Sequence, residues 1–155
     1  MTSQTSKSTT SFSFPDVNVW FALLLENHVH HETAKAWWNT DVSDAIVFSR
    51  FTQLSLLRLL TTAAAMNGKP LSMRQAWSVY DQLYQDDRVA LVTEPDEFEP
   101  TLRKLSASRI ASPKVWADAC MLAFAERVPA KLVTFDKALS NRGADCLVLT
   151  NTPSD

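Results

Sequence analysis

The stretch FSFPDVNVWFALLL, residues 12–25, contains the pattern that decides the fold. Residues 12–14 form a short predicted strand, and Pro15 stops it because proline cannot donate to a sheet ladder. The unbroken apolar run from Val19 to Leu25 then predicts a helix that is covered on most sides. A strand that leads directly into a helix is the repeating unit of parallel sheets, so we expect an α/β domain.

The rest of the chain repeats this alternation of strand and helix. We expect Ser49 and Ser72 to cap two helices, the first reaching about Met66 with Leu54, Leu57 and Leu60 on its apolar stripe. The pattern therefore predicts a mainly parallel sheet of four to five strands. The further strands are expected at 45–48, 88–93, 131–135 and 146–150, and the further helices at 31–39, 49–66, 72–85, 96–107 and 115–128.

Length and composition fit one globular domain. The chain has 155 residues, of which 46% are hydrophobic and 21% charged, which excludes wholesale disorder. We expect a flexible tail over residues 1–11, one domain over 12–150 and a frayed end over 151–155. No apolar run approaches the roughly 20 residues that cross a bilayer, and the first residues lack the apolar core of a secretory signal. A cytoplasmic protein without membrane contact is therefore expected.

The formal net charge of −2 gives no global basic field of the kind that many nucleic-acid-binding proteins have. If RNA or DNA is the substrate, its phosphates must be held by local basic residues and by metal ions. The two cysteines, Cys120 and Cys146, have no metal-ligand spacing and are expected to stay reduced.

Three aspartates share a structural position in this arrangement. Asp16 follows the first predicted strand, Asp136 follows the fourth, and Asp118 lies in the first turn of the helix before the fourth strand. In doubly wound sheets, ligands bind beyond the carboxyl ends of the strands where the winding reverses. We expect the first and fourth strands to be neighbours there, so that the three carboxylates converge. Taken singly, each aspartate is equally typical of a helix cap, a first helical turn or a tight turn.

Converging carboxylates point to a particular chemistry. They repel one another, and burial adds to the cost of ionising them. Mg²⁺ or Mn²⁺ relieves both effects, because these ions prefer oxygen ligands and keep waters and substrate phosphate oxygens. Such an ion activates a bound water for attack on a phosphodiester, so that no serine or cysteine nucleophile is needed. Asp16, Asp118 and Asp136 are therefore the candidate metal ligands and catalytic residues.

At these residues the sequence resembles PIN-domain proteins, in particular the VapC-type toxins of bacterial toxin–antitoxin pairs. The resemblance extends from about Phe12 to Thr150 in the right order, and its most specific element is the long block in residues 50–61. The stretches that carry it are Pro-Asp-Val-Asn-Val-Trp (15–20), Arg-Phe-Thr-Gln-Leu-Ser-Leu-Leu-Arg-Leu-Leu-Thr (50–61), Trp-Ala-Asp-Ala (116–119) and Val-Thr-Phe-Asp (133–136).

The resemblance implies a three-layer α/β/α sandwich and a Mg²⁺- or Mn²⁺-dependent endoribonuclease. It also implies an RNA substrate, a VapB-like antitoxin that covers the site, and a homodimer. Asp16, Asp118 and Asp136 match the family's first, third and fourth acidic positions. Asn18 and Thr134 match polar residues beside the first and the last of these positions.

One departure from the family pattern concerns its second acidic position. Ser55 stands where many members have a glutamate, and Gln53 lies on a different face of the helix. A serine cannot supply the missing negative charge, which leaves a second metal ion in doubt. Glu94 and Glu126 are the alternative carboxylates, and the sequence does not choose between them.

Other residues that bear on chemistry are histidines, tryptophans and basic residues. His28, His30 and His31 lack the spacing of a zinc site and are expected to be solvated or at a helix start. Most tryptophans fit core or dimer packing. The candidate RNA contacts are Arg50, Lys137 and Trp116.

Two other functions remain open. A PIN fold that has lost activity with the missing glutamate would keep only partner binding. A phosphatase of the haloacid dehalogenase type also places an aspartate after a strand, but it needs a second aspartate where Asn18 stands.

Overall fold

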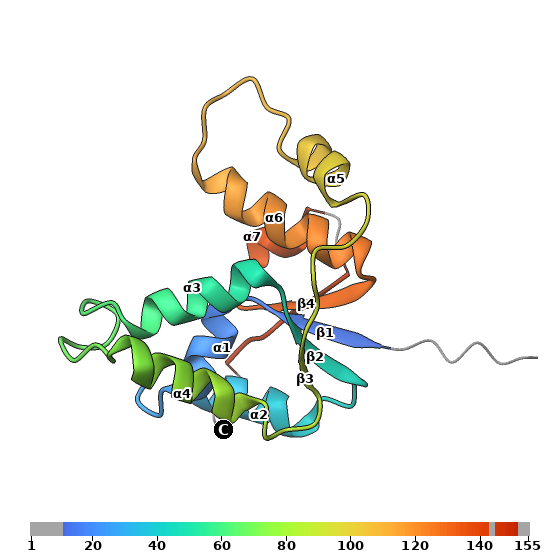
Figure 1. The fold of residues 1–155 in the computed structure, drawn as a ribbon. Coiled ribbons are helices and arrows are strands. Elements are labelled where there is room, and N and C mark those ends of the chain that lie inside the picture. The colour runs from blue at the N-terminus through green and yellow to red at the C-terminus, as the bar shows by residue number, and fades with distance from the viewer. Residues whose placement is uncertain (1–10, 143–144, 152–155) are drawn as a thin grey trace, which may run out of the picture.

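A computed structural model describes residues 11–142 and 145–151, so most of the predicted tail and of the predicted frayed end lies outside the described residues. Strands and helices alternate along the chain (Figure 1). The strands are β1 (Phe12–Pro15), β2 (Ala45–Phe48), β3 (Val89–Leu91), β4 (Ala130–Thr134) and β5 (Cys146–Val148). The helices are α1 (Val17–Leu24), α2 (His31–Thr40), α3 (Arg50–Leu60), α4 (Met73–Leu83), α5 (Phe98–Leu105), α6 (Lys114–Arg127) and α7 (Lys137–Ser140).

The five strands form one parallel sheet in the order β3-β2-β1-β4-β5. The chain winds outward from β1 through β2 to β3, then returns to the other side of β1 for β4 and β5. The predicted parallel sheet and the predicted neighbourhood of the first and fourth strands are both confirmed. The register pairs Pro15 with Val133, which sets the carboxyl ends of β1 and β4 side by side.

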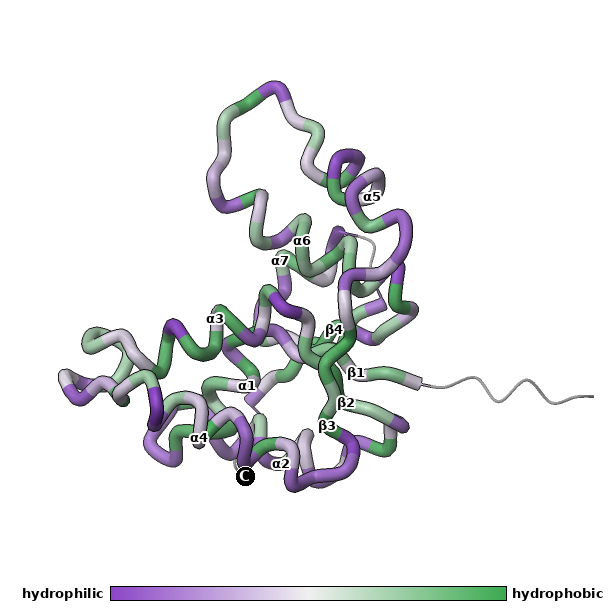
Figure 2. Tube along the Cα trace, in the orientation of Figure 1, coloured by the Kyte–Doolittle hydropathy of each residue, from purple (hydrophilic) through white to green (hydrophobic). Residues whose placement is uncertain are grey.

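Helices cover both faces of the sheet, which confirms the three-layer sandwich. Successive strand residues point to opposite faces, so Ile46 and Phe48 join one core cluster and Val47 joins the other. Helices α1 to α4 pack on the first face, and α5, α6 and α7 on the second (Figure 1). The strands are predominantly hydrophobic along the Cα trace, whereas the outer helices mix hydrophobic and hydrophilic residues (Figure 2).

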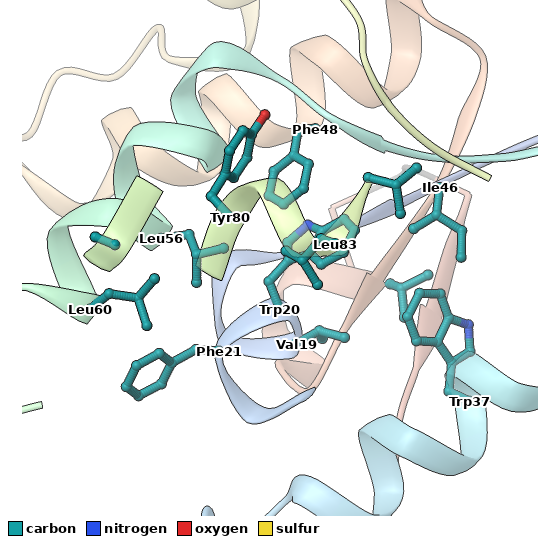
Figure 3. Close-up of a cluster of buried hydrophobic side chains, with 13 residues drawn as sticks. Val19, Trp20, Phe21, Trp37, Ile46, Phe48, Leu56, Leu60, Tyr80 and Leu83 are labelled. Atoms are coloured by element: carbon teal, nitrogen blue, oxygen red, sulfur yellow. The ribbon is translucent and has the colours of Figure 1, made fainter. Parts of the chain in front are cut away.

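The core of the first face is built around an aromatic stack. The ring of Trp20 lies 4.0 Å from that of Phe48 with an interplanar angle of 11°. Leu56 and Leu60 of α3 and Tyr80 of α4 close the same cluster (Figure 3). Each fully buried side chain of this size contributes roughly 1.5–3 kcal/mol through removal of apolar surface from water.

The second face rests on α6, whose apolar C-terminal half is buried, in agreement with the predicted apolar side of this helix. The ring of Phe124 meets that of Phe14 at 4.4 Å. Leu122 and Leu132 complete the contact between this helix and β4, and Leu139 anchors the short helix α7 in the same cluster. This packing fixes α6 and α7 over the ends of β1 and β4.

Helix α3 differs from its prediction in length and in orientation. It ends at Leu60 instead of Met66, and the segment that follows forms turns with Asn67 and Gly68 at positive φ. The hydroxyls of Thr61 and Thr62 donate to backbone carbonyls one turn earlier, an interaction that competes with continued helix. The buried stripe is Thr52, Gln53, Leu56 and Leu60, whereas Leu54 is 55% exposed.

Several smaller boundaries also differ. Helix α5 starts at Phe98 because Glu97 adopts a left-handed conformation with φ of 62°. Strands β3 and β5 are shorter than predicted, and α7 was not predicted. His31 does start α2, but it is buried, with Nδ1 2.8 Å from the carbonyl oxygen of Ala22, so the solvated interpretation is wrong for this residue. Among the described residues, no helix has the length and apolar character to cross a membrane.

Candidate metal centre

The carboxyl ends of β1 and β4 form the point where the winding of the sheet reverses. Asp16 follows Pro15 at this point, and its backbone N–H donates to the carbonyl of Val133 at 2.8 Å. Because Pro15 pairs with Val133, Asp16 lies level with Thr134, the last residue of β4. Crevices beyond such strand ends are the usual ligand sites of doubly wound sheets.

Thr134 connects two of the predicted aspartates. Its side-chain hydroxyl donates to Oδ2 of Asp16 at 3.1 Å and accepts the backbone N–H of Asp136 at 3.0 Å. Thr134 is fully buried, so this bridge is held in a fixed place. The carboxylate of Asp16 makes no side-chain cap to α1, so capping does not explain this residue.

Asp136 is the cap of α7, whereas the structural alternative for this residue in the sequence was the closing of a turn. Its Oδ1 accepts the backbone N–H of Ala138 at 2.9 Å. Asp136 is otherwise exposed. One cap bond uses one of the two carboxylate oxygens, so capping and metal binding are compatible at this residue.

Asp118 approaches from the other layer. The sequence predicted Asp118 in the first turn of its helix, and this is wrong. Helix α6 begins at Lys114, so Asp118 stands in its second turn. Its side chain is 44% exposed, and its Oδ2 lies 3.8 Å from Nη1 of Arg142. In the sequence, Arg142 is one of several basic residues that flank the aspartates, six positions after Asp136, and its contact with Asp118 was not predicted.

The charges of the three aspartates act on one another. Burial raises the pKa of the Asp16 carboxyl, and the negative charges of Asp118 and Asp136 raise it further. The hydrogen bond from Thr134 acts in the opposite direction and favours the ionised form. The carboxyl edge of the sheet therefore holds a half-buried carboxylate that a nearby cation would stabilise.

The donor set fits a hard divalent cation that keeps part of its hydration shell. Within residues 11–142 and 145–151, no group of three or more histidine, cysteine, aspartate or glutamate side chains is gathered closely enough to hold a metal ion by itself. Mg²⁺ commonly uses one or two carboxylates together with waters and substrate phosphate oxygens. An open set of carboxylates, one of them with a raised pKa, suits that mode of binding.

Comparison with known proteins decides the family. The model of the PIN domain matches residues 13–144. The chain belongs to the PIN-domain family. The PIN domain is 41% identical over 133 residues to Ribonuclease VapC41 of Mycobacterium tuberculosis, covering 83% of this chain and 91% of that relative. It is 29% identical over 129 residues to Ribonuclease VapC44 of the same organism, covering 81% and 86%.

Solved structures share the fold of this PIN domain at low sequence identity. The toxin VapC20 of Mycobacterium tuberculosis, described as cleaving the Sarcin-Ricin loop, superimposes with a TM-score of 0.62 at 20% identity, covering 86% of this chain and 96% of that one. VapBC2 from Rickettsia felis, bound to a DNA fragment from its promoter, gives a TM-score of 0.59 at 12% identity, with 88% and 96% covered.

The polar residues that the resemblance placed around the aspartates have different surroundings in the PIN domain. Asn18 is exposed in the first turn of α1, and Ser55 is half-buried on α3. Gln53 is buried and accepts a hydrogen bond from the guanidinium of Arg50. Among the described residues, no hydrogen bond connects these three side chains to the aspartates.

The candidate RNA contacts surround the centre unevenly. Arg50 and Lys137 are exposed at the first positions of α3 and α7, which both start at the carboxyl edge of the sheet. Trp116 is 64% exposed and lines a surface hollow with the segment that connects α5 to α6. Two positions along an α-helix correspond to a rotation of about 200° around its axis. Trp116 therefore lies on a different side of α6 from Asp118.

Proposed function

We propose that this PIN domain is a metal-dependent endoribonuclease that acts as the toxin of a type II toxin–antitoxin pair. One observation carries the proposal: the half-buried Asp16 is bonded to Thr134 and lies within the electrostatic reach of Asp118 and Asp136 at the switch point of the sheet. The 41% identity to a protein named as a ribonuclease, over most of both chains, supports the same activity.

In this proposal Asp16, Asp118 and Asp136 hold Mg²⁺ or Mn²⁺. The bound ion would supply an activated water and would stabilise the charge that develops on the scissile phosphate. Thr134 orients Asp16, and its hydrogen bond favours the ionised form of the carboxyl. Ser55, Gln53 and Asn18 are the proposed supporting residues, and the lack of a carboxylate at Ser55 favours one firmly held ion over two.

Arg50, Lys137 and Trp116 are the proposed RNA contacts. The two basic side chains suit phosphates, and the exposed indole suits a stacked base. The net charge of −2 makes such local contacts necessary, because the chain has no overall attraction for a polyanion.

The proposed protein partner is a VapB-like antitoxin. Helices α3 and α4 leave an apolar hollow of about 310 Å³ between them, lined by Leu54, Leu57, Arg58, Thr61, Met73, Ala76 and Trp77. Exposed apolar surfaces of this kind mark interaction sites in soluble proteins. We assign this hollow to an apolar helix of the antitoxin. We also propose that the toxin forms a homodimer, for which sedimentation at micromolar concentration is the direct measurement.

A second candidate function is a PIN fold that binds partners without catalysis. It is favoured by the lack of a tightly gathered set of ligands among the described residues and by Ser55 in place of a carboxylate. The two candidates differ in one measurable property, because only the nuclease cleaves RNA when Mg²⁺ or Mn²⁺ is added.

The deciding experiment compares cleavage of total RNA by the native chain, Asp16→Asn and Asp87→Asn. Asp87 is an exposed aspartate before β3, at the opposite edge of the sheet, and serves as the matched control. We expect Mn²⁺-dependent cleavage by the native chain and by Asp87→Asn, a loss of at least about 100-fold in Asp16→Asn, and no cleavage with a chelator. Equal cleavage by all three proteins would refute the proposal.

A further inference from the structure

Arg142 forms an ion pair with Asp118, one of the three aspartates of the candidate metal centre. Its Nη1 lies 3.8 Å from Oδ2 of Asp118. Among the described residues, the other ion pairs join Arg88 to Asp86 and Arg103 to Glu99, both away from the aspartates at the switch point. The pair between Arg142 and Asp118 is therefore the direct charge compensation that the described structure provides for this site.

The fold holds Arg142 in this position. Helix α7 starts at its cap, Asp136, and Arg142 follows just beyond its end, with its backbone N–H bonded to the carbonyl of Leu139. Leu139 is buried against α6, which fixes the short helix. Nη2 of Arg142 also donates to the carbonyl of Leu105 at 3.4 Å. The short helix α7 thus has Asp136 of the candidate metal centre at its start and Arg142 just beyond its end.

The ion pair between Arg142 and Asp118 is weak enough for a divalent cation to displace the guanidinium from the carboxylate. At 3.8 Å it is an ion pair without a short hydrogen bond, and the arginine side chain is 34% exposed. Such pairs contribute little to stability because water screens them and because two long side chains must be ordered. A divalent cation competes for the same carboxylate with twice the charge. The guanidinium that it displaces matches the geometry of a phosphate.

We propose that Arg142 is a substrate-positioning residue of this centre: it neutralises Asp118 before metal binding and contacts an RNA phosphate once the metal has taken the carboxylate. This inference rests on the proposed nuclease function. It implies that Arg142 opposes metal binding and favours RNA binding, two opposite effects that a purely structural residue would not produce.

The test uses Arg142→Gln and Arg142→Lys, with Arg103→Gln as the control because Arg103 makes an exposed ion pair on α5. Calorimetric titration with Mn²⁺ alone should show tighter binding to Arg142→Gln than to the native chain, by about three- to tenfold. Arg142→Lys keeps the charge and should bind Mn²⁺ close to the native chain. Arg103→Gln should leave Mn²⁺ binding unchanged.

The second readout is the affinity for a fluorescently labelled RNA oligonucleotide of mixed sequence in the presence of Ca²⁺. It should fall about tenfold in Arg142→Gln, the usual effect of losing a charged hydrogen bond, with partial recovery in Arg142→Lys. Circular dichroism verifies that the variants fold. Unchanged or weaker Mn²⁺ binding, or unchanged RNA binding, in folded Arg142→Gln would overturn the inference. If the native chain binds no Mn²⁺, the nuclease proposal fails with it.

Discussion

At the scale of single residues, Asp16 combines a structural cost with its proposed use as a metal ligand. Burial and the negative charges of two other aspartates raise the pKa of its half-buried carboxyl, and one hydrogen bond from Thr134 offsets part of this effect. Sequence alone predicted this aspartate because it follows a recognisable strand end, and the family resemblance added Thr134, the last residue of β4. Arg142 was one of several basic residues that flank the aspartates in sequence, but no pattern distinguished it from a solvated side chain or predicted its contact with Asp118.

Replacing Thr134 with valine tests the role of its hydroxyl. The change removes the hydrogen bond that favours the ionised carboxylate, so the pKa of Asp16 should rise further while the packed volume stays similar. The acidic limb of the pH profile of RNA cleavage should therefore move to higher pH. The measurement is cleavage rate against pH with saturating Mn²⁺. An unchanged limb, or one that moves to lower pH, would show that Thr134 does not act on Asp16.

Replacing Asp16 with asparagine should stabilise the metal-free chain at neutral pH while abolishing cleavage. A carboxyl whose pKa is raised by folding binds its proton more tightly in the folded state, so its ionisation opposes folding above that pKa. The gain in the free energy of unfolding should shrink on acidification towards the pKa of an ordinary carboxyl. Urea unfolding at several pH values measures it, and the control Asp87→Asn should show no such pH-dependent gain.

At the scale of elements, local signals were the most predictable. Ser49 and Ser72 both cap their helices, and each forms a reciprocal pair with the residue three positions on, Thr52 and Gln75 respectively. The ends of elements were less predictable. Helix α3 stops at Leu60 because threonine hydroxyls bond to its last turn, a competition that depends on side-chain rotamers and not on hydrophobic spacing.

The two caps provide a matched pair for a stability prediction. Ser49→Ala should cost about 1–2 kcal/mol and Ser72→Ala about 0.5–1 kcal/mol in the free energy of unfolding. The difference arises because Ser49 is buried, so the backbone N–H that it leaves unpaired cannot bond to water, whereas Ser72 is exposed. Urea denaturation of both variants measures the order, and a larger loss in Ser72→Ala would contradict this explanation.

At the scale of the whole molecule, strand order turns separate aspartates into one site. Asp16 and Asp136 lie 120 positions apart in the sequence and meet because β4 returns to the side of β1. The winding rule of doubly wound sheets and the family resemblance suggested this order, since strand-forming patterns themselves do not specify which strands become neighbours. The same limit applies to Trp116, which is two positions from Asp118 in sequence but on another side of α6.

Two exposed tryptophans should separate the two proposed partners. Trp77 lines the apolar hollow between α3 and α4, and Trp116 lines the surface near the α5–α6 connection. Trp77→Ser should weaken binding of the antitoxin by about 30-fold, typical of an interfacial tryptophan, and leave RNA binding unchanged. Trp116→Ser should do the reverse. The probes are a VapB-like antitoxin that binds the native chain and a labelled RNA, and a loss of both activities in either variant would contradict this separation.

The proposed metal centre is tested most directly by calorimetric titration of the metal-free chain with Mn²⁺, repeated for Asp16→Asn, Asp118→Asn and Asp136→Asn. We predict measurable binding to the native chain and a loss of at least about tenfold in affinity for each variant, since each aspartate is proposed to supply a ligand. Absence of binding to the native chain, or equal affinity in Asp16→Asn, would contradict a metal centre at the carboxyl ends of β1 and β4.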